Sequence, residues 1–354
     1  MRRRSLPLGL APILAAVLLG GLATGCRTPS APALSRFEFS RPEMGMPFRI
    51  VLYAATPAQA TNAVEAAFDR IAVLNAELSD YEDDSELTRL SHSSGSGAWV
   101  AVGDDLWRVL VHAQRVAEQS GGAFDITVGP LVQQWRRARR ERELPPPAQL
   151  AAALRAVGWQ KVELDHRHRR VRLLVPKMRL DLGGIAKGFA LQEAFEVLRH
   201  HGVSRALVTG GGDMVAGDPP PGRTGWRIEL APLDVPNAPP PRYVQLRRMA
   251  LVTSGDLYQR VEIDGVRYSH IVDPHTGMGL TDHSLVTLIA PDGMTADALS
   301  KVVAVLGPVR GTPFVEAEPG AAAQVVRQPA GQLEFAVSRR LGAFLEPADP
   351  PTRP

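Results

Sequence analysis

An acid and a base one helical turn apart are the first residues in this sequence that could do chemistry. Asp297 and Lys301 lie in "TADALSKVVAVLG" (295–307), which has the pattern of a short helix beginning near Thr295. Side chains at this spacing are neighbours on a helix, so the spacing alone predicts a surface ion pair worth roughly 0.3 kcal/mol. The alternative is a metal site in which lysine has replaced a ligand.

A glycine pair before a helix is the second candidate. A strand-like run ends at Asp181, and Gly183 and Gly184 follow it. Backbone N–H groups at the start of the next helix could approach a phosphate, and Lys187 in its first turn would add a point charge. P-loop spacing is absent, so a tight turn with a surface lysine is the alternative. The chain has four lysines against 36 arginines, which favours a chemical role for Lys187.

The stretch "YSHIVDPHTG" (268–277) is the third candidate, at the end of a predicted hairpin. His270 could act as a general base, with Asp273 orienting the loop or a neighbouring group. A structural role for the histidine is the alternative. No zinc-binding spacing occurs, and a single cysteine excludes a site built on thiolates. A hard ion held by oxygen atoms, such as Mg²⁺, is the one metal to consider.

Other loops carry weaker signals. Phe124 and Asp125 follow paired glycines in "SGGAFDITVGPLVQQW" (120–135), and Tyr81 stands among acids in "LSDYEDDSEL" (78–87). Each alone is typical of a loop anchored in the core. We predict a turn at "TGGGDM" (209–214) and no dinucleotide-binding fold, because the proline-rich residues after it cannot begin a helix.

The N-terminus predicts export. Three arginines, an apolar run and small residues before Cys26 are typical of a signal peptide (1–25), and Cys26 resembles a lipidation site. A Pro/Ser-rich tether (26–36) follows. Removing residues 1–25 lowers the formal charge of +3 to about zero, which argues against nucleic-acid binding. The residues "WRRARRERE" (135–143) are then a solvated helical face.

The rest of the chain must position these residues. We expect one large folded domain (37–345) and a disordered tail (346–354). The patterns predict two strands over 36–55, helices over 57–81 and 104–118, and surface connectors at 142–150 and 231–242. Strands are expected over 205–211, 225–231, 244–254 and 284–290, with a hairpin turning at Asp264-Gly265. Because helices and strands do not alternate regularly, we predict an α+β fold.

Seven stretches, taken in order, resemble the ApbE family, the FAD:protein FMN transferases. They are "MGMPF", "LSDYEDDSEL", "GGAFDITVGPLVQQW", "DLGGIAKGFA", "LVTGGGDM", "TSGDLYQRVEIDGVRYSHIVDPHTG" and "TADALSKVVAVLG". They span residues 44–307, and their shared order is more specific than any one of them. The lipoprotein-like start also fits many family members.

The resemblance implies a FAD-binding cleft between two closely packed subdomains. It implies an enzyme that uses Mg²⁺ and FAD, attaches FMN to a threonine of a partner protein through a phosphoester bond, and releases AMP. The partner would be a flavin-accepting subunit of a membrane redox complex of the sodium-pumping quinone reductase (Nqr) or Rnf type, or another protein with a flavinylation motif. The enzyme would be periplasmic and lipid-anchored to a bacterial membrane.

The resemblance also implies roles for single residues. His270, in a His-Ile-x-Asp-Pro motif with Asp273, would be the base for the accepting hydroxyl. Gly184, through its carbonyl, and Asp297 would hold Mg²⁺, with Lys301 at the position of another ligand. The implied FAD contacts are Met44, Tyr81, Ala123, Phe124, Asp125, Asp181, Lys187 and Ile271.

The chain departs from the family pattern at the metal site. Lys301 stands where the family usually has a threonine whose hydroxyl binds the metal. Gln192 replaces a common acid, Phe189 a tyrosine, and Gly279 follows "TGM" in place of the usual proline pattern. Two other functions therefore stay open. One is a FAD-binding lipoprotein without transfer activity, with the Lys301 ammonium in the metal's place, and the other is a FAD pyrophosphatase that uses water as acceptor.

Overall fold

The computed structural model describes residues 33–238, 240–257 and 259–346. The predicted signal peptide, Cys26 and residues 347–354 of the predicted tail lie outside the described residues. The described residues from Leu34 onward form one compact unit, which is not divided into the two subdomains that the resemblance implies. Its first strand begins at Ser35, and residues 35–36, assigned to the tether from the sequence, belong to that strand.

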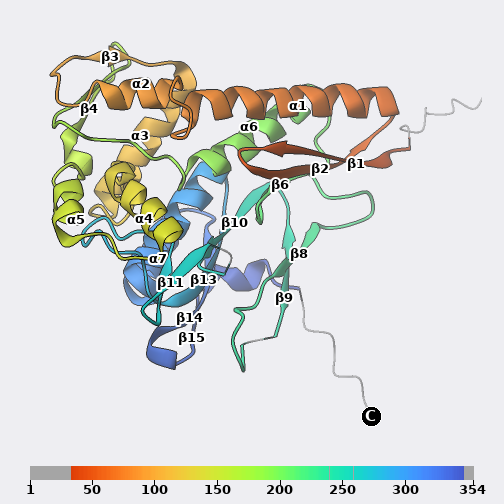
Figure 1. Cartoon of the computed structure of the whole chain (residues 1–354). Helices are drawn as coiled ribbons and strands as arrows, with labels where there is room; N and C mark the ends of the chain where they lie inside the picture. The colour runs from red at the N-terminus through yellow and green to blue at the C-terminus, as the bar shows by residue number, and fades with distance from the viewer. Residues whose placement is uncertain (1–32, 239, 258, 347–354) are drawn as a thin grey trace, which may run out of the picture. The chain divides into compact units, whose positions relative to one another are not determined.

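Fifteen strands occur among the described residues, most of them in one antiparallel sheet. They are β1 (Ser35–Glu43), β2 (Met46–Ala54), β3 (Val100–Ala101), β4 (Val162–Asp165), β5 (Arg170–Leu173), β6 (Ala206–Gly210), β7 (Asp213–Ala216), β8 (Trp226–Leu230), β9 (Arg242–Leu246), β10 (Met249–Gly255), β11 (Arg260–Ile263), β12 (Val266–Ser269), β13 (His283–Ala290), β14 (Ala322–Gln328) and β15 (Glu334–Val337). The main sheet has the order β1-β2-β6-β7-β10-β13-β14-β15, and the small sheets are β3-β5-β4, β8-β9 and β11-β12 (Figure 1).

The α-helices of the described residues pack against this sheet and against one another. They are α1 (Pro57–Leu78), α2 (Glu86–His92), α3 (Asp104–Gln119), α4 (Gly129–Glu141), α5 (Pro147–Leu154), α6 (Ala186–His200) and α7 (Gly293–Ala317). Helix α6 lies between α1 and α7, and α7 packs on β10, β13 and β14. Every residue of β13 is buried, because this central strand is flanked by β10 and β14 and covered by α7. In the part of the chain that the structure describes, no helix has the length and apolar character needed to span a bilayer.

The predicted α+β class is confirmed, and most predicted elements form. The apolar stripe of α1 is fully buried, and the hairpin turn at Asp264-Gly265 has both residues at positive φ, 51° and 75°. The predicted strand over 244–254 is wrong as one element. It is divided between β9 and β10 at Arg248, whose φ of 51° breaks the extended backbone.

Two helices differ from the prediction. The connector predicted at 142–150 contains the start of α5, where Pro147 occupies the first helical turn, a position that tolerates proline. Helix α7 starts at Gly293, capped by Asp292, and extends well beyond a short helix near Thr295. Its regular geometry is interrupted at Gly307, which has φ 71° and precedes a proline.

Helices α6 and α7 approach each other closely at a glycine contact. A Cβ on Gly188 would lie 2.0 Å from the carbonyl oxygen of Gly293, and one on Gly293 would lie 2.0 Å from the carbonyl oxygen of Gly188. Only glycine permits this separation. The contact brings the first turn of α6, with Lys187, beside the first turns of α7, with Asp297.

Candidate active site

Asp297 and Lys301 form a buried ion pair on α7. Lys301 Nζ lies 2.5 Å from Asp297 Oδ1, and the exposed fractions of the two side chains are 16% and 0%. The other carboxylate oxygen, Asp297 Oδ2, accepts a hydrogen bond from Gly188 N at 3.1 Å. The surface-pair interpretation of the spacing is therefore wrong, because the glycine contact between α6 and α7 covers the carboxylate.

Two serine hydroxyls complete the surroundings of the Lys301 ammonium. Nζ donates to Ser254 Oγ at 2.8 Å and to Ser300 Oγ at 3.2 Å, and the two hydroxyls are 2.8 Å apart. Sequence reasoning missed both serines. Ser254 comes from β10 and Ser300 from α7, and only the packing of these elements joins them.

A second ion pair links α6 to the sheet. Lys187 Nζ lies 2.7 Å from Oδ2 of Asp213, a fully buried side chain at the start of β7. Although burial alone would lower the pKa of Lys187, the carboxylates of Asp213 and Asp297 raise it. Asp213 belongs to "TGGGDM", which was predicted only as a turn, so its role was missed. The predicted lysine is thus partly buried and paired with an acid, so the surface-lysine alternative is wrong.

At the start of α6, where a phosphate-binding turn was predicted, two backbone N–H groups already donate hydrogen bonds within the protein. Ala186 N donates to Leu182 O at 2.8 Å, and Gly188 N is taken by Asp297. Gly184, just before the helix, packs against the neighbouring site: a Cβ there would lie 3.2 Å from both Lys301 Cγ and Phe124 Cε2. The structure thus brings together three residues predicted from distant stretches.

A nearby group of charges surrounds Asp181. Arg136 donates to Asp80 at 2.6 and 3.1 Å and to Asp181 at 3.3 Å. Its guanidinium lies 4.0 Å from the ring centroid of Tyr81, whose side chain is exposed. Burial, and then Asp80, raise the pKa of Asp181. Tyr81 therefore presents an aromatic face that is fixed by Arg136 and open to solvent.

The segment around Asp125 is held by its own carboxylate. Oδ1 accepts from Thr127 N and Thr127 Oγ1, and Oδ2 accepts from Trp159 N. Burial raises the pKa of Asp125. Ala123 and Phe124 are buried in the same segment. All three were predicted to contact FAD; in this structure the carboxylate of Asp125 is used to shape the loop.

His270 lies within the electrostatic field of the two lysines. Its Nδ1 is 3.1 Å from Gln259 O, and it is half-buried beside the buried Ile271. Burial, followed by the positive charge of Lys301, lowers the pKa of His270 from 6.5 to about 4, and Arg139 and Lys187 act in the same direction. The imidazole is therefore neutral at pH 7 and able to accept a proton.

Asp273 shapes the turn after His270. Its Oδ1 accepts from His275 N at 2.8 Å, and its backbone carbonyl accepts from Gly277 N at 2.8 Å. No contact between the Asp273 side chain and His270 is recorded in the described residues. The contacts of Asp273 therefore support the expected role in orienting the loop, and not the role of orienting His270.

Met44 forms the turn between β1 and β2, with φ 48°. Met46, two residues further on, lies beside Gly211 together with Lys187: a Cβ on Gly211 would be 2.6 Å from Met46 Sδ and 3.6 Å from Lys187 Nζ. The hairpin thus reaches the site through Met46, which the sequence did not single out.

The residues around Lys301 do not fit the Mg²⁺ implied by the resemblance. Mg²⁺ requires near-octahedral oxygen ligation at roughly 2.1 Å. Here the ammonium and Gly188 N occupy both oxygens of Asp297. Within the described ranges, no group of three or more His, Cys, Asp or Glu side chains is placed to hold a metal ion.

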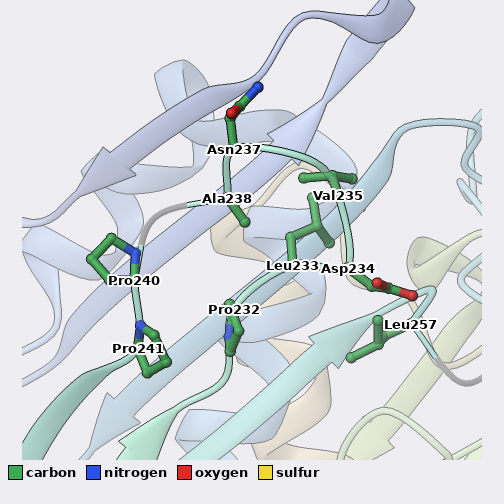
Figure 2. Close-up of a pocket in the computed structure, with 9 residues that line it drawn as sticks. All are labelled: Pro232, Leu233, Asp234, Val235, Asn237, Ala238, Pro240, Pro241 and Leu257. Atoms are coloured by element: carbon green, nitrogen blue, oxygen red, sulfur yellow. The ribbon is translucent and has the colours of Figure 1, made fainter.

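An open hollow of about 420 Å³ lies elsewhere on the surface, between the β8–β9 connection and Leu257 (Figure 2). Its lining residues are Pro232, Leu233, Asp234, Val235, Asn237, Ala238, Pro240, Pro241 and Leu257. None of the predicted site residues is among them.

The two lysines that pair with buried acids could offset negative charge on a phosphate, and a neutral histidine could accept a proton. The family pattern "ApbE family" matches residues 44–325, and the chain belongs to this family.

Relatives of known structure and relatives of assigned function are similar to this chain over most of its length. It is 31% identical to the FAD:protein FMN transferase of Klebsiella pneumoniae, covering 89% of this chain and 93% of that protein. It is 34% identical to that of Treponema pallidum, covering 80% and 83%. The flavin transferase ApbE from Vibrio cholerae has a TM-score of 0.79 at 27% identity, covering 88% of this chain and 100% of that chain.

Proposed function

We propose that this chain transfers FMN from FAD to a threonine hydroxyl of a partner protein. The observation that carries the proposal is the pair of lysines held beside each other, Lys187 by Asp213 at 2.7 Å and Lys301 by Asp297 at 2.5 Å, because two fixed positive charges suit a diphosphate. Family membership and relatives named FAD:protein FMN transferases support the choice of substrate. The partner would be a flavin-accepting subunit of the Nqr or Rnf type.

In the proposed reaction, the threonine oxygen attacks the phosphorus on the FMN side of the diphosphate. A phosphoester bond forms, the bridging P–O bond breaks, and its electrons leave with AMP. His270 accepts the hydroxyl proton. Lys187 and Lys301 stabilise negative charge on the phosphate oxygens. No step is assigned to Mg²⁺, because the donor set does not fit it.

The remaining predicted residues would hold FAD in place. Tyr81 offers an exposed ring for stacking on the flavin or adenine. Phe124 and Ile271 would supply apolar contacts near Gly184 and His270, and Asp125 and Asp181 would act mainly by holding their loops.

One experiment separates this function from its alternatives. The purified chain is incubated with FAD and a flavin-accepting domain of the Nqr type, with a threonine-to-alanine version of that domain as control. Flavin bound covalently to the threonine domain alone supports transfer. FMN and AMP without bound flavin support a pyrophosphatase, and retained, uncleaved FAD supports a binding protein.

We also propose that the chain acts outside the cytoplasm, lipid-anchored to a membrane through Cys26. The signal-like residues before Cys26 support this proposal. Cys26→Ser should move the protein from the membrane fraction to the soluble fraction of cells. An unchanged distribution would contradict the anchor.

A further inference from the structure

Three oxygen atoms surround the Lys301 ammonium. An ammonium has three N–H donors, and Nζ has three oxygen neighbours, Asp297 Oδ1, Ser254 Oγ and Ser300 Oγ. The hydroxyls are oriented consistently, since Ser300 Oγ donates to Asp297 O at 2.6 Å and is then free to accept from Nζ and from Ser254. The ammonium is therefore surrounded by three oxygen atoms, as a bound cation would be.

Lys301 is adjacent to the other residues of the candidate active site. The Lys301 side chain is partly accessible, its Cγ packs on Gly184, and its charge acts on both His270 and Asp213. Lys187 is paired with Asp213 and Lys301 with Asp297, so each buried carboxylate has a positive partner without a metal ion. A divalent cation at Asp297 would have to displace the ammonium and would then be repelled by it.

We propose that Lys301 supplies, at the diphosphate of FAD, the positive charge that a divalent cation would otherwise supply, so that FAD binding and FMN transfer by this chain need no divalent metal ion. The identity of the substrate rests on the proposed function. The metal independence rests on the contacts of Lys301.

The test measures FAD affinity of the purified full chain by flavin fluorescence, once in EDTA and once in saturating MgCl₂. We expect the two dissociation constants to agree within about twofold, whereas a tenfold gain with MgCl₂ would overturn the proposal. Titration calorimetry of the FAD-loaded chain with MgCl₂ should likewise show no saturable binding, and saturable binding would overturn it.

Lys301→Thr removes the ammonium and leaves an oxygen in reach of Asp297. We expect this variant to bind FAD about tenfold more weakly in EDTA and to regain affinity in MgCl₂. Affinity equal to the parent chain in EDTA would overturn the proposal. Lys177→Asn, at an exposed lysine, is the control and should behave like the parent chain, because asparagine tolerates the φ of 65° at this position.

A second variant covers the case in which Lys301→Thr does not fold, because it leaves Asp297 buried without its partner. The double variant Lys301→Met/Asp297→Asn removes both charges and keeps side chains of similar shape. It should fold and bind FAD weakly in both buffers, and full affinity would overturn the proposal. If the parent chain bound FAD only in MgCl₂, metal independence alone would be refuted. If the parent chain bound no FAD in either buffer, the proposed function would be refuted as well.

Discussion

Lys187 Nζ lies 2.7 Å from Asp213 Oδ2, and the carboxylate is fully buried where β7 begins. Its other oxygen accepts from Thr253 N on β10. One acid thus fixes the lysine of α6 against two strands of the main sheet. The lysine has a structural partner, and its charge also acts on His270, so its loss should affect both stability and FAD binding.

Lys187→Ala should lower the free energy of unfolding by about 3 to 5 kcal/mol, because it leaves the Asp213 carboxylate buried and unpaired. Urea denaturation followed by circular dichroism measures this change. Lys177→Ala, at an exposed lysine, is the control and should be neutral. The double variant Lys187→Met/Asp213→Asn should recover stability without recovering FAD affinity. A stable single variant would contradict the role of the pair.

Gly188→Ala should prevent the close approach of α6 and α7, because its Cβ would lie 2.0 Å from Gly293 O. Overpacking of this kind costs typically about 1–3 kcal/mol and here moves two backbones. Gly342→Ala, at a glycine with open space around it, is the control. Equal melting temperatures for the two variants would refute the tight contact.

Tyr81→Ala should weaken FAD binding about fivefold and leave the melting temperature nearly unchanged, because the ring is exposed and only its stacking is lost. Fluorescence titration with FAD gives the affinity. Tyr243→Ala removes another tyrosine that stacks on an arginine, at the β8–β9 sheet, and should bind FAD normally. Normal FAD binding by Tyr81→Ala would remove Tyr81 from the site.

The acid limb of the pH profile of kcat/KM should lie near pH 4, well below 6.5. The lowered pKa keeps His270 neutral as the pH falls, and the base is lost only near its pKa of about 4. Arg139→Ala removes one of the positive charges near the imidazole and should move the limb to higher pH. Arg140→Ala, at the adjacent exposed arginine, should not. A limb at pH 6.5 in folded protein would contradict the assignment.

Local patterns predicted the elements well. The apolar spacing of α1 and the Asp264-Gly265 turn each depend on residues close in sequence, so periodicity and turn chemistry were enough. The family motifs, taken in order, also named residues that the fold does gather, including Gly184, Phe124 and Lys301.

The contacts that define the site could not be predicted. Ser254 and Asp213 gain their roles only when β10 and β7 pair and α7 packs on the sheet. The burial of Asp297 follows from two glycines on different helices, which no spacing rule reveals. Helix α5 was missed because prolines suggested a connector, although proline is tolerated in a first helical turn.

The ratio of AMP released to flavin attached distinguishes FMN transfer from hydrolysis of FAD. The chain is incubated with FAD and a flavin-accepting domain, and AMP released is compared with flavin attached to the domain by intact mass. We predict equal amounts of the two, and no reaction beyond trace levels in a His270→Ala variant that still binds FAD. Release of AMP without attached flavin, or full activity in His270→Ala, would contradict it.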